Sequence, residues 1–569
     1  MFLASLVART SEPSPATPRH IVFIVADDLG FNDVSFHGST QIPTPAIDEL
    51  ASSGLVLDNY HAQPVCSPTR ASLLSGRHAI HHGIYMPFAQ GTALRLNLSY
   101  TLLPGYLRKL GYSTHAVGKW HLGQNVLAAL PTGRGFDTYY GYWSGAEDYI
   151  THSTHNAYDF ADGTESCLAA NGTYSTYLFT ERAVSIIDHH DFKSDPFFLY
   201  LAYQNVHWPL EAPQEYLDRF ASTTGGDKAR QAVAAMAAIL DDGVRNVTDA
   251  LKRNGAWEST LLVFVSDNGG PTNGNEGTAS NNYPMRGGKN TLWEGGTRVV
   301  GLVRGAGVAP SLRGTVSRAP FHAVDWLRTL VSFASDGHAP FAPPPGEPPY
   351  LDGDGVDQTK LLTAAASAVR DELLLECHPE AAIGWDAAEW ARRGYGLPEG
   401  GDRRAADGLA VHGNGLIVGG WKLLQLGPTR PSDEAGWHPP PGQDPATTTY
   451  TLGCDLAQQP AEPANGSAWC VDAPCLFDVV NDPCEYHDVA KAHPDIVARL
   501  TSRLAQLQAT AVPPVVPEGC NPVVTDGVWR PCDAPNPDAR HDEAEMVEMR
   551  AAAVPKKLAA ISMLVTPSK

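Results

Sequence analysis

The sequence predicts an α/β protein with a doubly wound sheet domain and a smaller C-terminal α+β domain. Three short apolar runs, IVFIVA (21–26), FFLYLAY (197–203) and LLVFVS (261–266), are typical of strands buried on both faces. Segments with helical spacing of apolar residues lie between these runs, and such alternation is the pattern of α/β folds. The length of 569 residues exceeds what one core usually supports, which favours a second domain.

The individual elements follow from local patterns. Residues 102–110 show helical spacing and end at Gly111, a natural stop, and residues 228–253 predict a long helix. Segments 415–426 and 494–508 predict a hairpin and a helix, in a region rich in cysteine and turn residues. We therefore expect a leader or tail, a large α/β domain, a small domain with disulfides and a C-terminal extension, at residues 1–18, 19–405, 406–533 and 534–569.

Composition excludes two classes of partner. Lys and Arg number 41 against 62 Asp and Glu, a formal charge of -21, so binding to nucleic acid or to an anionic membrane surface is not expected. No run reaches the roughly 18 apolar residues that a transmembrane helix needs. An anionic substrate would require local cations or a metal ion to overcome the overall charge.

Cysteines and glycosylation sequons indicate the secretory pathway, with a lysosomal or extracellular destination. Six of the nine cysteines fall in the last third, and local pairs are expected between Cys475 and Cys484 and between Cys520 and Cys532. The odd count leaves one cysteine without a partner. The Asn-x-Ser/Thr sequons, which predict a glycoprotein, begin at Asn97, Asn171, Asn246 and Asn465.

Polar residues gather where the predicted strands end. Asp27 and Asp28 directly follow the first apolar run, and Asp267 and Asn268 follow the third. His207 comes shortly after the second run, and a further strand-like segment, THAV (114–117), leads to Lys119 and His121. Ligand sites of open α/β sheets lie at the carboxyl ends of the strands, so these side chains are expected at one rim.

The two acidic pairs predict a site for a hard cation. Carboxylate and amide oxygens suit Ca²⁺ or Mg²⁺, and Ca²⁺ is favoured because several protein oxygens can fill its larger shell. The alternative is that each pair caps a helix after its strand.

Cys66 lies in the segment VCSPTRASLLSGR (65–77). Strand-like residues 55–62 lead into it, and a helix is expected to begin at Ser72, which places Cys66 near a helix N-terminus that favours an anion. Arg70 can supply a fork of donors to the same place. The alternative is a buried structural cysteine or half of a disulfide.

Two groups of residues resemble the signatures of the sulfatase family. The first is Cys66-Ser67-Pro68-Thr69-Arg70 with Leu73-Leu74-Ser75-Gly76-Arg77, and the second is Gly111-Tyr112-Ser113-Thr114 with Gly118-Lys119-Trp120-His121-Leu122-Gly123. Thr69 and Ser75 depart from the commoner residues but remain small. Within the family the chain looks most like the arylsulfatase B group, the N-acetylgalactosamine-4-sulfatases, and Asp482-Pro483-Cys484-Glu485 and Gly527-Val528-Trp529 contribute to that similarity.

The resemblance implies an alkaline-phosphatase-like fold and a nucleophile made after translation. The formylglycine-generating enzyme would oxidise Cys66 to an aldehyde, whose hydrate offers one hydroxyl to attack sulfur and a second to expel sulfate later. One Ca²⁺ would be held by residue 66 together with Asp27, Asp28, Asp267 and Asn268.

The resemblance also implies roles for the remaining site residues. Asp267 would be the base, and Arg70 and Lys119 would orient the diol and the sulfate. Lys289, in Arg286-Gly287-Gly288-Lys289, would also meet sulfate. His207, with Lys289, would protonate the leaving alcohol and His121 would accept the later proton, duties that suit the near-neutral pKa of histidine.

The expected substrate is a sulfate monoester on a carbohydrate, such as N-acetylgalactosamine 4-sulfate, or on an aryl alcohol. Aromatic residues that either stack on sugar rings or belong to the core are Tyr139, Tyr140, Tyr142, Trp143 and Trp208. Histidines expected at the surface or in the substrate pocket are His37, His81, His82, His152 and His155. Two other functions stay open: a phosphate or phosphonate ester hydrolase of the same superfamily, and a calcium-bound glycan-binding protein with an unmodified Cys66.

Overall fold

The computed structural model describes residues 19–337, 353–364, 369–377, 413–426, 436–445, 448–460, 470 and 473–534. The predicted leader, the predicted domain boundary near residue 405 and all but the first residue of the predicted extension lie outside the described residues. The described residues up to Cys532 form one compact unit. None of the described helices combines the length and the apolar character that a bilayer crossing requires.

A large mixed sheet forms the centre of this unit. Within the described residues its strands run in the order β13 (Thr315–Ser317), β2 (Leu55–Leu57), β12 (Gly301–Gly305), β11 (Thr260–Ser266), β1 (His20–Ala26), β10 (Phe197–Ala202), β4 (Ser113–Gly118), β5 (Thr138–Gly141), β8 (Ala161–Asp162) and β9 (Glu165–Ser166). The five central strands β11, β1, β10, β4 and β5 are parallel. Their carboxyl ends therefore meet at one edge.

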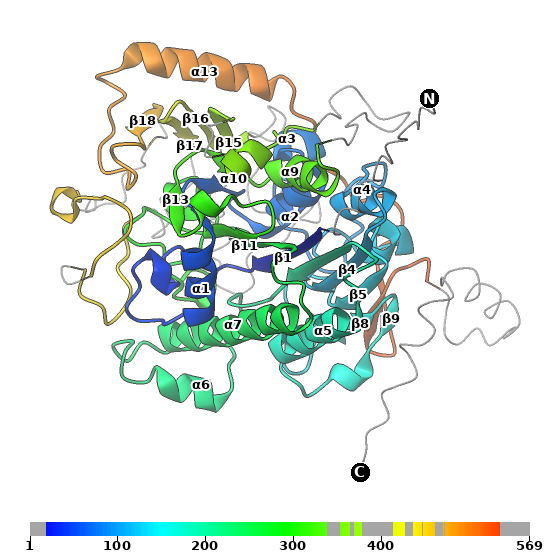
Figure 1. The fold of residues 1–569 in the computed structure, drawn as a ribbon. Coiled ribbons are helices and arrows are strands. Elements are labelled where there is room, and N and C mark those ends of the chain that lie inside the picture. Colours follow the sequence, from blue (N-terminus) through cyan, green and yellow to red (C-terminus); the bar gives the residue numbers. More distant parts are fainter. Residues whose placement is uncertain are drawn as a thin grey trace, which may run out of the picture. The chain divides into compact units, whose positions relative to one another are not determined.

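Helices cover both faces of this sheet, which confirms the doubly wound α/β fold. Side chains of β1 alternate between two apolar cores: Phe23 packs in one and Ile24 in the other. The first core is completed by α2 (Cys66–Ser75), α4 (Leu103–Lys109) and α9 (Asp325–Ala334), and the second by α1 (Pro45–Ser53), α5 (Ser175–His189) and α7 (Lys228–Arg253). Figure 1 shows α5 and α7 below the strands and α2, α4 and α9 above them.

Smaller sheets accompany the large one. The hairpin and the helix predicted at 415–426 and 494–508 are β16–β17 and α13. The antiparallel sheet that contains this hairpin is β15 (Glu372–Cys377), β16 (Gly413–Val418), β17 (Trp421–Leu426) and β18 (Cys475–Asp478), and α13 (Pro494–Gln508) packs on it. The other short elements are β3 (Tyr60–His61), β6 (Ser153–Thr154), β7 (Ala157–Tyr158), β14 (Phe321–His322), β19 (Val523–Thr525), β20 (Val528–Arg530), α3 (Ala79–His82), α6 (Gln214–Arg219), α8 (Glu294–Thr297) and α10 (Thr359–Ala364).

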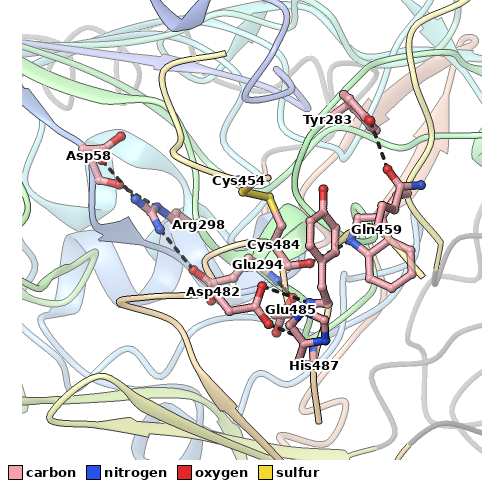
Figure 2. Close-up of a disulfide and its surroundings, with 12 residues drawn as sticks. Asp58, Tyr283, Glu294, Arg298, Cys454, Gln459, Asp482, Cys484, Glu485 and His487 are labelled. Atoms are coloured by element: carbon pink, nitrogen blue, oxygen red, sulfur yellow. Dashed lines mark hydrogen bonds and ion pairs between the residues drawn. A yellow bond between two sulfur atoms is a disulfide. The ribbon is translucent and has the colours of Figure 1, made fainter. Parts of the chain in front are cut away.

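The disulfides confirm one predicted pair and correct the other. Cys520 bonds Cys532 as expected, but Cys475 bonds Cys470 and Cys484 bonds Cys454 (Figure 2). The prediction of a Cys475–Cys484 pair was wrong because Cys475 opens the extended strand β18, which carries the chain away before Cys484.

The number of unpaired cysteines also differs from the prediction of one. Among the described residues Cys66, Cys167 and Cys377 are all unpaired.

Candidate active site

The structure brings the acidic pairs of two strands into contact. Strands β1 and β11 pair in register, with Ala26 opposite Ser266, so the residues that follow them lie side by side. The Asp28 backbone N–H donates to Asp267 Oδ1 at 3.2 Å, and Asn268 Nδ2 donates to Asp28 Oδ1 at 2.7 Å. Asp27 is buried beside them.

Three buried cations surround these carboxylates. Lys119 Nζ lies 2.6 Å from Asp27 Oδ2, and Lys289 Nζ lies 2.8 Å from Asp28 Oδ2. Arg70 donates from Nη2 and Nε to Asp267 Oδ2 at 2.7 and 3.0 Å. Such pairing is what allows charges to remain inside a protein.

Cys66 is the first residue of α2, so the helix begins six residues earlier than the sequence predicted. Pro68 does not prevent this start, because the N–H groups of a first helical turn have no intrahelical partner. Burial raises the pKa of the Cys66 thiol to about 11, although Lys119 and Lys289 act in the opposite direction. The unmodified thiol is therefore protonated at neutral pH and is a poor nucleophile.

His121 faces the sulfur of Cys66. Its Nδ1 lies 3.3 Å from Cys66 Sγ, and its Nε2 lies 3.0 Å from the carbonyl oxygen of Phe88. A carbonyl only accepts, so the proton belongs on Nε2 and Nδ1 is left as an acceptor. Burial, with Lys119, lowers the pKa of His121 well below its usual value.

His207 approaches the same carboxylates from the loop after β10. Its Nδ1 donates to the carbonyl of Trp208 at 2.6 Å, and its Nε2 lies 3.7 Å from Asp28 Oδ2. Burial, with Lys289 and Lys119, lowers the pKa of His207 well below its usual value. Both site histidines are thus neutral at pH 7, in contrast to the near-neutral pKa expected from the sequence.

The donor set fits a hard cation. Asp27, Asp28 and His207 offer ligand atoms within 4.8 Å of one another. Asp27 Oδ1 and Asn268 Oδ1 are buried oxygens that lack a hydrogen-bond partner within the described part of the chain, and unsatisfied buried acceptors are costly unless something binds them. Oxygen-rich surroundings of this kind suit Ca²⁺ or Mg²⁺.

Sequence reasoning missed one site residue, Glu276. Its Oε2 lies 2.7 Å from Lys289 Nζ, and its side chain is only 8% exposed. Glu276 follows no strand and stands in the polar loop NGNEGTAS, so no local pattern marks it.

The structure narrows the alternatives that the sequence left open for the aromatic and histidine sets. Four of the aromatic residues are buried in the core, and Trp208 alone of that set is partly exposed, beside His207. His37, His82 and His152 were expected either at the surface or in the substrate pocket; all three are buried, which excludes the surface position.

Comparisons with known proteins agree with this geometry. Residues 19–336 match the family "Sulfatase". Mouse (Mus musculus) arylsulfatase J is 36% identical over 539 residues, which cover 92% of this chain and 81% of the relative. Mouse N-acetylgalactosamine-6-sulfatase is 31% identical over 303 residues, which cover 49% of this chain and 56% of the relative.

A solved structure shares the fold. The crystal structure of Ps i-CgsB in complex with k-i-k-neocarrahexaose superposes with a TM-score of 0.66 at 25% identity and covers 95% of this chain and 98% of that chain. The comparisons do not single out the arylsulfatase B group. They establish that this chain belongs to the sulfatase family and is a sulfate ester hydrolase.

Proposed function

We propose that this chain hydrolyses sulfate monoesters of carbohydrates with a formylglycine made from Cys66 and one Ca²⁺. The observation that carries the proposal is the position of Cys66. It is the first residue of a buried helix, it faces His121, and the positive charges of Lys119 and Lys289 act on it electrostatically. A helix N-terminus between buried cations suits an anionic ester.

The metal and the modified residue would supply the chemistry that the other side chains lack. Ca²⁺ held by Asp27, Asp28, Asp267 and Asn268 would act as a Lewis acid toward the ester, and hydrated formylglycine would supply the attacking hydroxyl. Arg70 and Lys119 are held in place by their ion pairs and would orient the sulfate oxygens.

Asp267 is the proposed base for the attacking hydroxyl. Burial, followed by the nearby carboxylate of Asp27, raises the pKa of Asp267, while Arg70 and Lys119 act against this. A carboxylate with a raised pKa holds a proton more readily, which suits a general base.

Two groups are proposed to protonate the leaving alcohol, and one is proposed to accept a proton in the last step. Lys289 stays protonated because Asp28 and Glu276 raise its pKa well above the usual value against the effect of burial, so it can donate a proton directly. His207 is neutral with its proton on Nδ1, so it would act as a donor only after it takes up a proton at Nε2. His121 would accept the later proton at Nδ1, the nitrogen that faces residue 66.

A sulfated sugar is the proposed substrate class. The names of two similar proteins support it: one is an N-acetylgalactosamine sulfatase, and the other was crystallised with a neocarrahexaose. N-acetylgalactosamine 4-sulfate is the first compound to test, because of the resemblance to the arylsulfatase B group, with an aryl sulfate as the alternative.

The secretory pathway, with a lysosomal or extracellular destination, completes the proposal. The three disulfides indicate an oxidising compartment. Asn97, Asn171 and Asn246 are exposed, as glycosylation requires, and Asn465 lies outside the described residues.

The first experiment determines the chemical state of residue 66 and the activity together. The protein would be secreted from cells that contain the modifying enzyme. The mass of the tryptic peptide that contains residue 66 would then be measured by mass spectrometry. We expect the mass of the aldehyde, turnover of 4-nitrophenyl sulfate, and loss of turnover in Cys66→Ala. Turnover by a protein whose Cys66 is an intact thiol would refute the mechanism. An intact Cys66 thiol together with glycan binding and no turnover would favour the glycan-binding alternative.

The second experiment tests the metal without relying on activity. A ligand that binds only the folded state stabilises it, by about 2.7 kcal/mol at 100 times its Kd. We expect Ca²⁺ to raise the Tm of the chelator-treated protein and Asp27→Asn/Asp28→Asn to abolish the rise. An unchanged Tm in the unsubstituted protein, measured by calorimetry, would contradict a calcium site.

A further inference from the structure

Glu276 places a carboxylate against the cation that is proposed to meet the sulfate group. Lys289 Nζ lies between Asp28 Oδ2 at 2.8 Å and Glu276 Oε2 at 2.7 Å. The exposed fractions of these three side chains are 0% for Asp28, 3% for Lys289 and 8% for Glu276. Solvent therefore screens this charge only weakly.

The backbone of the loop is shaped to present this carboxylate. Glu276 has φ 53° and ψ 21°, the left-handed region that residues with a Cβ seldom occupy. Asn273, Gly274 and Gly277 in the same loop also have positive φ. A sparsely populated conformation at a site residue points to a functional reason for its position.

The charge of Glu276 acts on the reaction centre. Glu276 raises the pKa of His207, against the larger lowering by burial and by the two lysines, so its field reaches the histidine proposed for the leaving group. When ionised, Glu276 adds a fourth carboxylate, beside Lys289, to the three that pair with Arg70, Lys119 and Lys289. It lowers the positive potential that an incoming anion meets.

We propose that Glu276 is a specificity-determining residue that favours monoanionic sulfate esters over dianionic phosphate esters. Repulsion by one fixed carboxylate grows in proportion to the charge of the ligand. A sulfate monoester carries one negative charge, whereas a phosphate monoester carries two above its second pKa of about 6. The charge of Glu276 thus makes the free energy of binding less favourable by about twice as much for the phosphate ester as for the sulfate ester. This inference rests on the proposed function and concerns the same site.

Binding of non-reacting analogues tests this inference separately from turnover. Calorimetry at pH 8.5 would compare benzenesulfonate, a monoanion, with phenylphosphonate, a dianion. In Glu276→Gln we expect affinity to rise about 5-fold for the sulfonate and about 25-fold for the phosphonate, because the second gain is the square of the first. Glu276→Asp, which keeps the charge, should retain most of the discrimination.

Turnover gives the second readout. We expect Glu276→Gln to raise the ratio of kcat/KM for 4-nitrophenyl phosphate to that for 4-nitrophenyl sulfate by about fivefold at pH 8, and to raise it little at pH 5, where the phosphate ester is a monoanion. The matched control is Glu165→Gln, which removes an exposed carboxylate on β9, at the edge of the large sheet.

Two outcomes overturn the inference: equal gains for both analogues in Glu276→Gln, or the same change in Glu165→Gln. Failure of the proposed function looks different. In that case neither ester is turned over by protein with a verified aldehyde, while the binding comparison still reports on Glu276.

Discussion

Gly145 shows how one residue without a side chain fixes a site residue. A Cβ at this position would lie 2.6 Å from His121 Cε1 and 2.8 Å from its Nε2, closer than a Cβ comes to atoms of other residues in proteins. The imidazole ring is held on its other sides by Cys66 and by the carbonyl of Phe88. Space for His121 therefore depends on glycine at 145.

At the residue scale we predict that Gly145→Ala impairs catalysis more than folding. The added methyl group pushes the His121 ring away from residue 66, and displacement of a reacting group by about 1 Å can reduce the rate by about 100-fold. Steady-state kinetics with 4-nitrophenyl sulfate and a thermal unfolding curve measure the two effects. Gly453→Ala is the control, because a Cβ there meets nothing within 4 Å. Unchanged kcat in Gly145→Ala would contradict the role given to His121.

At the scale of elements, Asp33 ties helix α7 to the loops beside the site. Its carboxylate accepts hydrogen bonds from Arg230 on α7, from the Ser280 hydroxyl, and from the backbone N–H groups of Gly30 and Asn281. Asp33 and Arg230 are both fully buried. The loop that begins at Ser280 leads to Lys289, so this ion pair helps to position a site cation.

We predict that Asp33→Ala destabilises the protein by about 3 to 5 kcal/mol, because it leaves the guanidinium of Arg230 buried without its carboxylate. The double variant Asp33→Ala/Arg230→Leu should be destabilised less than the two single variants added together, by at least about 1 kcal/mol in the free energy of unfolding. Urea unfolding measures both.

An exposed ion pair provides the control for this comparison of single and double variants. Arg253 and Asp188 are 50% and 34% exposed, so Arg253→Leu should cost no more than about 1 kcal/mol. Strict additivity of the Asp33 and Arg230 losses would show that the two residues do not act as a pair.

At the scale of the whole compact unit, a buried charge network joins the small sheet to helix α8. Lys422 on β17 lies 2.9 Å from Glu294 and 2.8 Å from Glu485, and all three side chains are fully buried. Glu294 opens α8, whose Gly295 N–H donates to the carbonyl of Arg286 near Lys289. Figure 2 shows Glu294 and Glu485 close to the Cys454–Cys484 disulfide.

The network predicts a pH dependence of stability. Burial, and then Glu294, raise the pKa of Glu485 to about 7 against the attraction of Lys422. The pKa of Glu485 is therefore higher in the folded protein than in the unfolded chain. Its contribution to stability is fully present below about pH 4.3 and is lost as the pH rises through about 7. Glu485→Gln removes this titration.

We therefore expect the stability of the unsubstituted protein relative to Glu485→Gln to fall by about 1 to 3 kcal/mol between pH 5 and pH 8. Denaturant unfolding at a series of pH values measures the difference, and Glu372→Gln, which removes the carboxylate of the partly exposed Arg503 pair, is the matched control. A difference that stays constant with pH would contradict a raised pKa at Glu485.

Local patterns in the sequence determined the sheet, the long helix and most of the site. Buried parallel strands appear as apolar runs, and residues that follow such strands must share one edge, so the strand pattern alone places Asp27, Asp267 and Lys119 together. Helix α7 has the bounds that its spacing predicted, because Asp227 caps its first turn by accepting from the Arg230 N–H.

Contacts between distant segments decided the rest. The partner of Cys475, the burial of Tyr142 and the ion pair of Glu276 with Lys289 all depend on which segments the fold brings together. Periodicity reports only which face of an element is apolar, and it carries no information about what covers that face. The sequence by itself therefore determined the family, the fold class and the strand-end residues, whereas the disulfide pairing, the start of α2 at Cys66 and the carboxylate beside Lys289 were decided by tertiary packing.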